Sequence, residues 1–328
     1  MEPLRVVSIG GGTGLSSLLA GLKKYANPEY EELRIDITAI VTVTDDGGSS
    51  GRLRRDFDVL PPGDIRNCMV ALSEDEGLLS RLFQYRFQAG HGLKGHSFGN
   101  LFLTALTNIT GDFPDAVKKS SEVLNIAGRI YPATAANVSL VAALDDGRLV
   151  KGETRISRSR KRIREIRLEP KRVRPLRETL DAIANADLIT MGPGSLFTSV
   201  IPNLLVSGIP AAIRASRATK AYFVNLMSQP GETVNFRASD HIAAIRDHAG
   251  GKILDCAVVS TSRISPMLKR RYATQSAAPV ENDVDRIRQM GIRVIEADLL
   301  HEDIKVRHDP DAAARVALQL AMDSRAGR

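Results

Sequence analysis

The sequence predicts an α/β protein built on a doubly wound, mostly parallel, Rossmann-like sheet that carries a small antiparallel β insertion. Apolar runs of strand length alternate with helical segments along most of the 328 residues, which is typical of parallel βα units. Glycine-rich loops follow two of these strands. Near the middle of the chain, two β-like runs meet around Asp145-Asp146-Gly147-Arg148, a hairpin signal that marks the insertion.

Composition bounds the class of protein. With 43% hydrophobic and 25% charged residues the chain can bury a large core, and we expect one α/β domain over 1–328 with an insertion at about 130–175. Cys68 and Cys256 belong to no Cys-x-x-Cys pair, so neither disulfides nor thiolate zinc sites are expected. No apolar run approaches the length of a membrane span, and the chain leads directly into a strand, so we expect a cytoplasmic protein without a membrane span.

The first element is a strand at 4–10 that passes through Gly10–Gly14 into a helix at 14–25. Glycines let backbone amides approach an anion at a helix N-terminus, so this turn predicts a phosphate site. The alternative is a merely tight turn between strand and helix. A complete dinucleotide fingerprint is absent, because Leu15 stands where the third glycine would be.

A second buried strand is expected at 35–44, and it runs into the polar segment Asp45–Arg54. Ligands of open α/β sheets bind at the carboxyl ends of strands, so Asp45 and Asp46 are candidates for binding a divalent ion or sugar hydroxyls. Either aspartate could instead be an ordinary turn or N-cap residue.

Helices are expected across 64–88, at 97–109 and at 113–127. Polar segments precede two of them, Pro61–Leu72 and His91–Leu106, and polar loops opening on rigid helices commonly form sites. His91 and His96 lack the helical spacing of a metal pair and a nearby carboxylate pair, so loop hydrogen bonding is the favoured interpretation.

The insertion combines the hairpin within 137–156 with a basic strand within 157–177, which supplies much of the formal charge of +7. The basic segment is interpreted in two ways: as a patch for anionic partners, or as a half-buried strand with a charged outer face, which the alternation of charged and apolar residues favours. Aromatic residues make up only 5% of the chain and do not interleave with these charges, so nucleic-acid binding is not expected.

The second half returns to βα alternation, with strands near 187–191, 211–213, 221–225, 256–260 and 292–296 and a terminal helix at 310–323. The loop Gly192-Pro193-Gly194-Ser195 follows the first of these strands and predicts a second anion-binding turn, with Ser195 or Thr198 as a cap or phosphate contact. Ser195 is not expected to be a nucleophile, because the Gly-x-Ser-x-Gly pattern is not matched.

Six motifs occur in order along the chain: GGGTG, TVTDDGGSSGRLR, PPGDIRNC, HSFGNL, GPGSLFTS and RHDP. Together they resemble the bacterial YvcK-type gluconeogenesis factors, within the superfamily of the 2-phospho-L-lactate transferase CofD. The resemblance implies a cytoplasmic regulator that binds UDP-sugars such as UDP-N-acetylglucosamine and is required for cell shape and growth on gluconeogenic carbon. It implies no settled reaction. The CofD relatives transfer a phospholactyl group from a nucleotide-activated donor with the help of a divalent metal.

The preferred hypothesis is therefore a nucleotide-sugar-binding regulator without catalytic residues. Two rivals stay open: a metal-dependent transferase acting on a nucleotide-activated phospho-substrate, and an NAD(P)-binding protein. Mg²⁺ would be the cofactor, with Asp46 as its candidate ligand. A homo-oligomer and a partner in cell-wall synthesis or signalling are expected. The predicted ligand-binding residues are Gly11, Gly12, Thr13, Gly14, Asp45, Asp46, Ser49, Asp64, Asn67, Asn100, Gly192, Gly194, Ser195, Thr198, Asn225, Tyr272 and Arg307.

Overall fold

The central sheet of the computed structural model, which describes residues 2–26, 34–74 and 77–327, has seven strands in the order β10-β9-β8-β7-β1-β2-β3. Every neighbouring pair is parallel. The strands are β1 Leu4–Gly10, β2 Ile35–Val41, β3 Arg129–Pro132, β7 Leu188–Met191, β8 Thr219–Phe223, β9 Cys256–Ser260 and β10 Arg293–Ala297. This arrangement confirms the predicted doubly wound α/β class.

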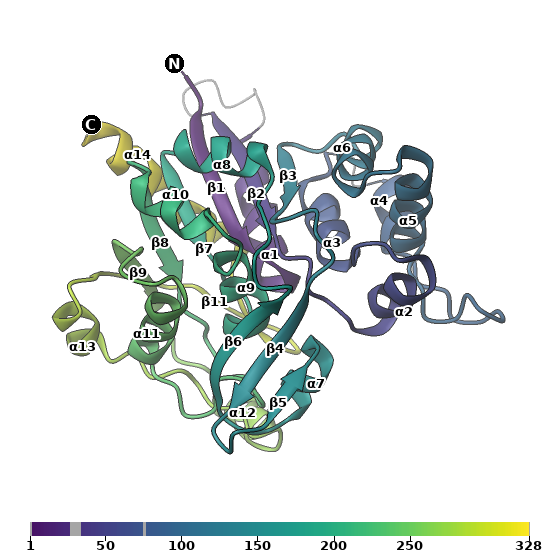
Figure 1. Ribbon diagram of the computed structural model, residues 1–328. Helices are drawn as coiled ribbons and strands as arrows, with labels where there is room; N and C mark the ends of the chain where they lie inside the picture. The colour runs from purple at the N-terminus through teal and green to yellow at the C-terminus, as the bar shows by residue number, and fades with distance from the viewer. Residues whose placement is uncertain (1, 27–33, 75–76, 328) are drawn as a thin grey trace.

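Helices cover the sheet, and α2 to α6 form one group on the β3 side of the molecule, in which α3 and α6 contact β3 (Figure 1). Strands near the centre of a parallel sheet are apolar throughout because both faces are covered, and all four residues of β7 are buried. The helices are α1 Gly12–Lys23, α2 Gly48–Phe57, α3 Gly63–Leu72, α4 Leu78–Gln84, α5 Phe98–Thr110, α6 Phe113–Val123, α7 Glu153–Arg158, α8 Arg177–Ala184, η1 Leu196–Val200, α9 Ile201–Leu204, α10 Ile209–Ala215, α11 Ala238–His248, α12 Pro266–Ala273, α13 Val284–Gln289 and α14 Pro310–Ala326.

The antiparallel insertion is a three-stranded sheet of order β5-β4-β6, made of β4 Ser139–Leu144, β5 Leu149–Lys151 and β6 Ile163–Glu169. The hairpin turns through Gly147, whose φ of 82° suits glycine. In β6 the residues Ile163, Ile166 and Leu168 are buried while most of the charged residues are exposed, so the half-buried interpretation of the basic strand holds. The hairpin's second run ends earlier than expected, because α7 begins at Glu153.

The structure differs from the strand predictions in three places: one predicted strand is helical, and the strand β3 and one hairpin were not predicted. The segment 211–213 lies in α10, because Gly208 turns the chain and Ile209 and Ile213 bury one helical face. The edge strand β3 was not predicted. Only two of its four residues are buried, so the segment lacks the continuous apolar run that indicates a central strand. A two-stranded antiparallel hairpin, β11 Leu300–Glu302 with β12 Val306–His308, was not predicted.

Within the described part of the chain, no single helix is long and apolar enough to cross a membrane. One bent pair, Leu196–Leu204 with Ile209–Ala215, satisfies the length and composition test when its two helices are taken together.

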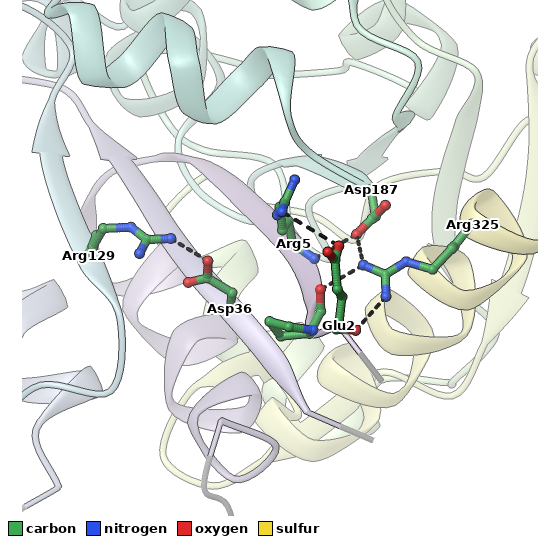
Figure 2. A network of polar contacts seen from close by, with 7 residues as sticks. Glu2, Arg5, Asp36, Arg129, Asp187 and Arg325 are labelled. Atoms are coloured by element: carbon green, nitrogen blue, oxygen red, sulfur yellow. Dashed lines mark hydrogen bonds and ion pairs between the residues drawn. The ribbon is translucent and has the colours of Figure 1, made fainter. Parts of the chain in front are cut away.

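A polar network joins the two ends of the chain at the amino ends of the strands (Figure 2). Asp187 is 4% exposed, accepts a hydrogen bond of 2.8 Å from the Arg5 amide and pairs with Arg325 of α14. Arg325 also donates to the carbonyls of Glu2 and Pro3 at 2.6 Å each. The terminal helix is therefore fastened to the first strand at the end of the sheet opposite the loops that follow β1 and β7.

The contact between α1 and α14 gives a prediction about stability. A Cβ on Gly21 would lie 2.0 Å from the Pro310 carbonyl oxygen, so the helices need glycine there. Gly→Ala in a helix normally stabilises by roughly 0.5–1 kcal/mol. Here we expect Gly21→Ala to lower the free energy of unfolding by about 2 kcal/mol or more, measured by urea denaturation. Ser16→Ala in the same helix is the control, and a stable Gly21→Ala protein would contradict the packing argument.

Candidate functional site

The site begins where the chain reverses its direction across the sheet. From β1 the chain proceeds to β2 and β3 on one side, and it later returns to place β7 on the other side of β1. The carboxyl ends of the two strands beside such a switch point diverge and leave a crevice for ligands. The glycine-rich loops after β1 and β7 meet there, since a Cβ on Gly14 would lie 2.4 Å from the Pro193 carbonyl oxygen.

A cavity of about 380 Å³ opens between these loops. Its wall is completed by the segment after β8, by α12 and by the β11–β12 hairpin. The lining residues are Gly11, Gly12, Thr13, Gly14, Ser17, Pro193, Gly194, Ser195, Ser199, Asn225, Leu226, Met227, Ser228, Gln229, Pro230, Tyr272, Gln275, Ala277, Lys305, Val306, Arg307 and His308.

Backbone amides form one end of the cavity. Helix α1 begins at Gly12, and its N-cap residue Gly11 offers no side-chain oxygen to the first amides. Gly12 has a φ of 64°, a conformation that favours glycine and turns the loop sharply into the helix. The first turn itself contains no acidic residue, so the positive end of the helix faces the cavity, with the buried Asp64 carboxyl group at the Gly12 amide behind it.

Cations and an aromatic ring line another part of the cavity. Lys305 and Arg307 come from the β11–β12 hairpin, and Tyr272 comes from α12. The Tyr272 hydroxyl accepts a hydrogen bond of 3.0 Å from the Val306 amide, which fastens the ring to the hairpin. His308 donates through Nε2 to the Val224 carbonyl at 3.1 Å, and burial lowers the pKa of His308 to about 4, so the ring is neutral near pH 7.

The structure brings nine of the predicted residues to the cavity wall. They are Gly11, Gly12, Thr13, Gly14, Gly194, Ser195, Asn225, Tyr272 and Arg307. Residues that sequence reasoning missed include Gln229, Lys305 and His308. The last two flank the arginine of the RHDP motif in the sequence, and that proximity was the available signal.

A buried acidic group lies behind the first loop. A Cβ on Gly11 would stand 2.6 Å from Asp64 Oδ2, so this carboxylate abuts the loop. Burial raises the pKa of Asp64 to about 7, with a further contribution from the charge of Asp45 and an opposing one from the Gly12 amide. Burial also raises the pKa of Asp45, although the Gly47 amide donates to its Oδ1 at 2.8 Å.

The insertion contributes Glu153, a buried carboxyl group that was not among the predicted site residues. Burial raises the pKa of Glu153 in α7 well above its usual value, and the charges of Asp45, Asp64 and Glu232 raise it further. Burial likewise raises the pKa of Glu232, against hydrogen bonds from Thr198, Phe197 and Ser157. Four carboxyl groups from distant parts of the chain therefore share one electrostatic environment.

Asp46, the candidate metal ligand, has a structural partner. Its Oδ1 accepts hydrogen bonds from the Thr154 amide at 2.9 Å and the Thr154 hydroxyl at 2.7 Å, so it caps the first turn of α7. Among the residues that the structure describes, no group of three or more His, Cys, Asp or Glu side chains is arranged to hold a metal ion. Metal binding by Asp46 stays a prediction.

The other predicted residues lie outside the cavity wall. Ser49 Oγ is 2.9 Å from His96 Nδ1, Asn67 accepts from Arg66 at 2.6 Å, and Asn100 Nδ2 donates to Ser50 Oγ at 3.5 Å. Thr198 donates to Glu232 at 3.0 Å. Gly192, with a φ of 71°, shapes the second loop without lining the cavity.

Comparisons with known proteins agree with this architecture. The family model described as 2-phospho-L-lactate transferase CofD matches residues 6–300. A gluconeogenesis factor of Halalkalibacterium halodurans is 48% identical over 320 residues, covering 97% of each chain, and the gluconeogenesis factor of Bacillus subtilis is 46% identical, covering 96% of this chain and 98% of that protein.

A crystal structure of a UPF0052-family protein from Bacillus halodurans superposes with a TM-score of 0.92 at 47% identity. The superposition covers 97% of this chain and 100% of that chain. Since both the sequence and the fold match over nearly the full length, the chain belongs to the CofD family and, within it, to the bacterial gluconeogenesis factors.

Proposed function

We propose that this protein is a cytoplasmic regulator that supports gluconeogenic growth and cell shape by binding a nucleotide sugar of the UDP-N-acetylglucosamine type in the 380 Å³ cavity. The names of the relatives support the role in gluconeogenesis. The ligand, the location, the effect on cell shape, a homo-oligomeric assembly and a partner in cell-wall synthesis or signalling are our inferences.

One observation carries the ligand assignment: the described lining of the cavity contains Lys305 and Arg307 and no aspartate or glutamate. A cavity with two cations, a helix N-terminus and glycine backbone favours an anion. Tyr272 adds an aromatic face on the same wall, on which a nucleobase can stack. Cations, backbone amides and an aromatic face on one cavity suit a ligand in which a diphosphate joins a base to a sugar.

The transferase alternative rests on the Asp45–Asp64 pair. Two neighbouring carboxyl groups beside the first loop are oxygen ligands of the kind that Mg²⁺ takes, with its remaining positions filled by water and phosphate. When bound there, the ion would neutralise charge on a diphosphate. Asp45 and Asp64 would hold it, and the Gly12 amide would keep the Asp64 carboxylate oriented.

The first prediction concerns Arg307. We expect Arg307→Gln to weaken UDP-N-acetylglucosamine binding by about tenfold or more, because a charge-assisted hydrogen bond to phosphate contributes roughly 1.5–3 kcal/mol. Isothermal titration calorimetry measures the affinity, and growth on a gluconeogenic carbon source tests the consequence. Arg217→Gln, at an exposed position outside the cavity, is the control. Equal affinity in both variants would refute the assignment of the cavity.

The second prediction concerns pH. Asp64 gains its negative charge as the pH rises through about 7, and this charge lies at the Gly12 amide, at the start of the helix whose N-terminus would hold the diphosphate. Without Mg²⁺ we therefore expect UDP-N-acetylglucosamine to bind several-fold more weakly at about pH 8 than at about pH 6. Asp64→Asn should remove most of this dependence, whereas Asp56→Asn, at an exposed position, should retain it. A flat profile for the unmodified protein would argue against a ligand phosphate beside Asp64.

The third prediction separates the regulator from its two rivals. After incubation with Mg²⁺, chromatography should recover UDP-N-acetylglucosamine intact, since a regulator binds without turnover. Metal-dependent product that disappears in Asp64→Asn would instead identify a transferase. Tighter binding of NAD⁺ than of the UDP-sugar would favour the dinucleotide alternative.

A further inference from the structure

A second cavity of about 430 Å³ lies between the insertion and the segment that follows β8. The insertion contributes Arg160, Lys161 and Arg162, which connect α7 to β6. The segment 231–236 and Asp240 form the remaining wall. None of these residues lines the first cavity.

The three consecutive cations are exposed. Among the ion pairs of the described residues, none involves Arg160, Lys161 or Arg162. The Arg162 guanidinium lies 5.6 Å from the centre of the Phe236 ring, which holds this cation at the cavity wall. Unpaired cations around a concave surface raise the local concentration of anions.

The two carboxylates of the wall are already engaged elsewhere. Glu232 is 5% exposed, and its oxygens accept hydrogen bonds from Thr198 at 3.0 Å and from Ser157 and the Phe197 amide at 3.3 Å each. Asp240 accepts from the Arg237 amide at 2.9 Å at the start of α11. Neither carboxylate is paired with the three cations, which remain available to a ligand.

The walls of this cavity are held close together by backbone packing. A Cβ on Gly231 would lie 2.0 Å from the Ser157 carbonyl oxygen, so the segment 231–236 rests directly on α7. Arg160 and Asn235 both adopt positive φ, at 52° and 60°, which fixes sharp turns on either side of the opening. The cations are therefore presented by a shaped surface and not by an extended strand face.

We propose that this second cavity binds a small phosphorylated metabolite, of the size of a sugar phosphate, and that its occupancy is coupled to the first cavity. A phosphate dianion can pair with two of the three cations, and the hydrogen-bond fork of arginine matches its oxygens. A nucleic acid is disfavoured, because Arg162 lies over the ring of Phe236, the aromatic side chain of this wall.

The coupling follows from contacts shared by the two cavities. Gln229 and Pro230 line the first cavity, and the next residues of the same segment line the second. Gln229 Nε2 donates to Ser195 Oγ at 2.7 Å, and Glu232 holds the start of η1 immediately after Ser195. A ligand that shifts the segment in one cavity therefore changes the second glycine-rich loop in the other.

The test of binding uses the full chain at low ionic strength, with glucose 6-phosphate as the probe and glucose as the uncharged comparison. We expect calorimetry to show binding of the phosphate ester only, and the triple variant Arg160→Gln, Lys161→Gln, Arg162→Gln to weaken it at least about tenfold. The matched control is Lys171→Gln, Arg172→Gln, Arg174→Gln, which removes three exposed charges from the same basic segment outside the cavity. Thermal melting checks that both variants fold.

Absence of glucose 6-phosphate binding, or equal weakening in the two triple variants, would overturn the proposed site. Arg307→Gln should leave this binding unchanged, which separates the second cavity from the first and makes the result independent of the proposed function.

The test of coupling rests on the proposed function, because it uses UDP-N-acetylglucosamine as the probe of the first cavity. Saturating glucose 6-phosphate should change the affinity for the UDP-sugar at least about threefold, and the UDP-sugar should change the affinity for glucose 6-phosphate by the same factor. The insertion triple variant should bind the UDP-sugar normally and lose the response. An unchanged affinity in the presence of bound glucose 6-phosphate would refute the coupling.

Discussion

The closeness of two backbone loops at the centre of the sheet is the constraint on which the rest of this structure depends. Gly14 and Pro193 approach so nearly that a single methyl group would force the loops apart. This approach is possible because β1 and β7 are hydrogen-bonded neighbours in the sheet, although they are far apart in the sequence. The helix start at Gly12, the second loop and the cavity between them all follow from that contact.

The charged groups at the two ends of the sheet differ in whether they have partners within the protein. At the amino ends, charges are paired within the protein: Asp187 satisfies the Arg5 amide and Arg325, and Arg129 of β3 pairs with Asp36 of β2. At the carboxyl ends, amides and cations are left facing a cavity, and the acidic groups lie behind the first loop with raised pKa values. The paired end stabilises the chain termini, whereas the open end keeps its charges for a ligand.

The insertion links the acidic residues behind the first loop to the second cavity. Asp46, in the loop after β2, caps α7 through Thr154, and α7 carries Glu153 into the shared acidic environment. The basic connection after α7 then forms the wall of the second cavity. The insertion therefore contacts the acidic residues through α7, and it exposes the basic residues 160–162 at the second cavity.

The sequence by itself determined the sheet class, the two glycine-rich turns and the insertion, because apolar periodicity and glycine position are local properties of the chain. It also nominated Tyr272 and Arg307 as ligand-binding residues, the latter within the RHDP motif. The tertiary structure alone decided which residues share a cavity, since Gln229 from the segment after β8 and Lys305 and His308 from the β11–β12 hairpin reach the same wall. It likewise decided the raised pKa values of Asp64 and Glu153 and the edge strand β3, because burial, charge proximity and strand pairing arise only when distant segments pack together.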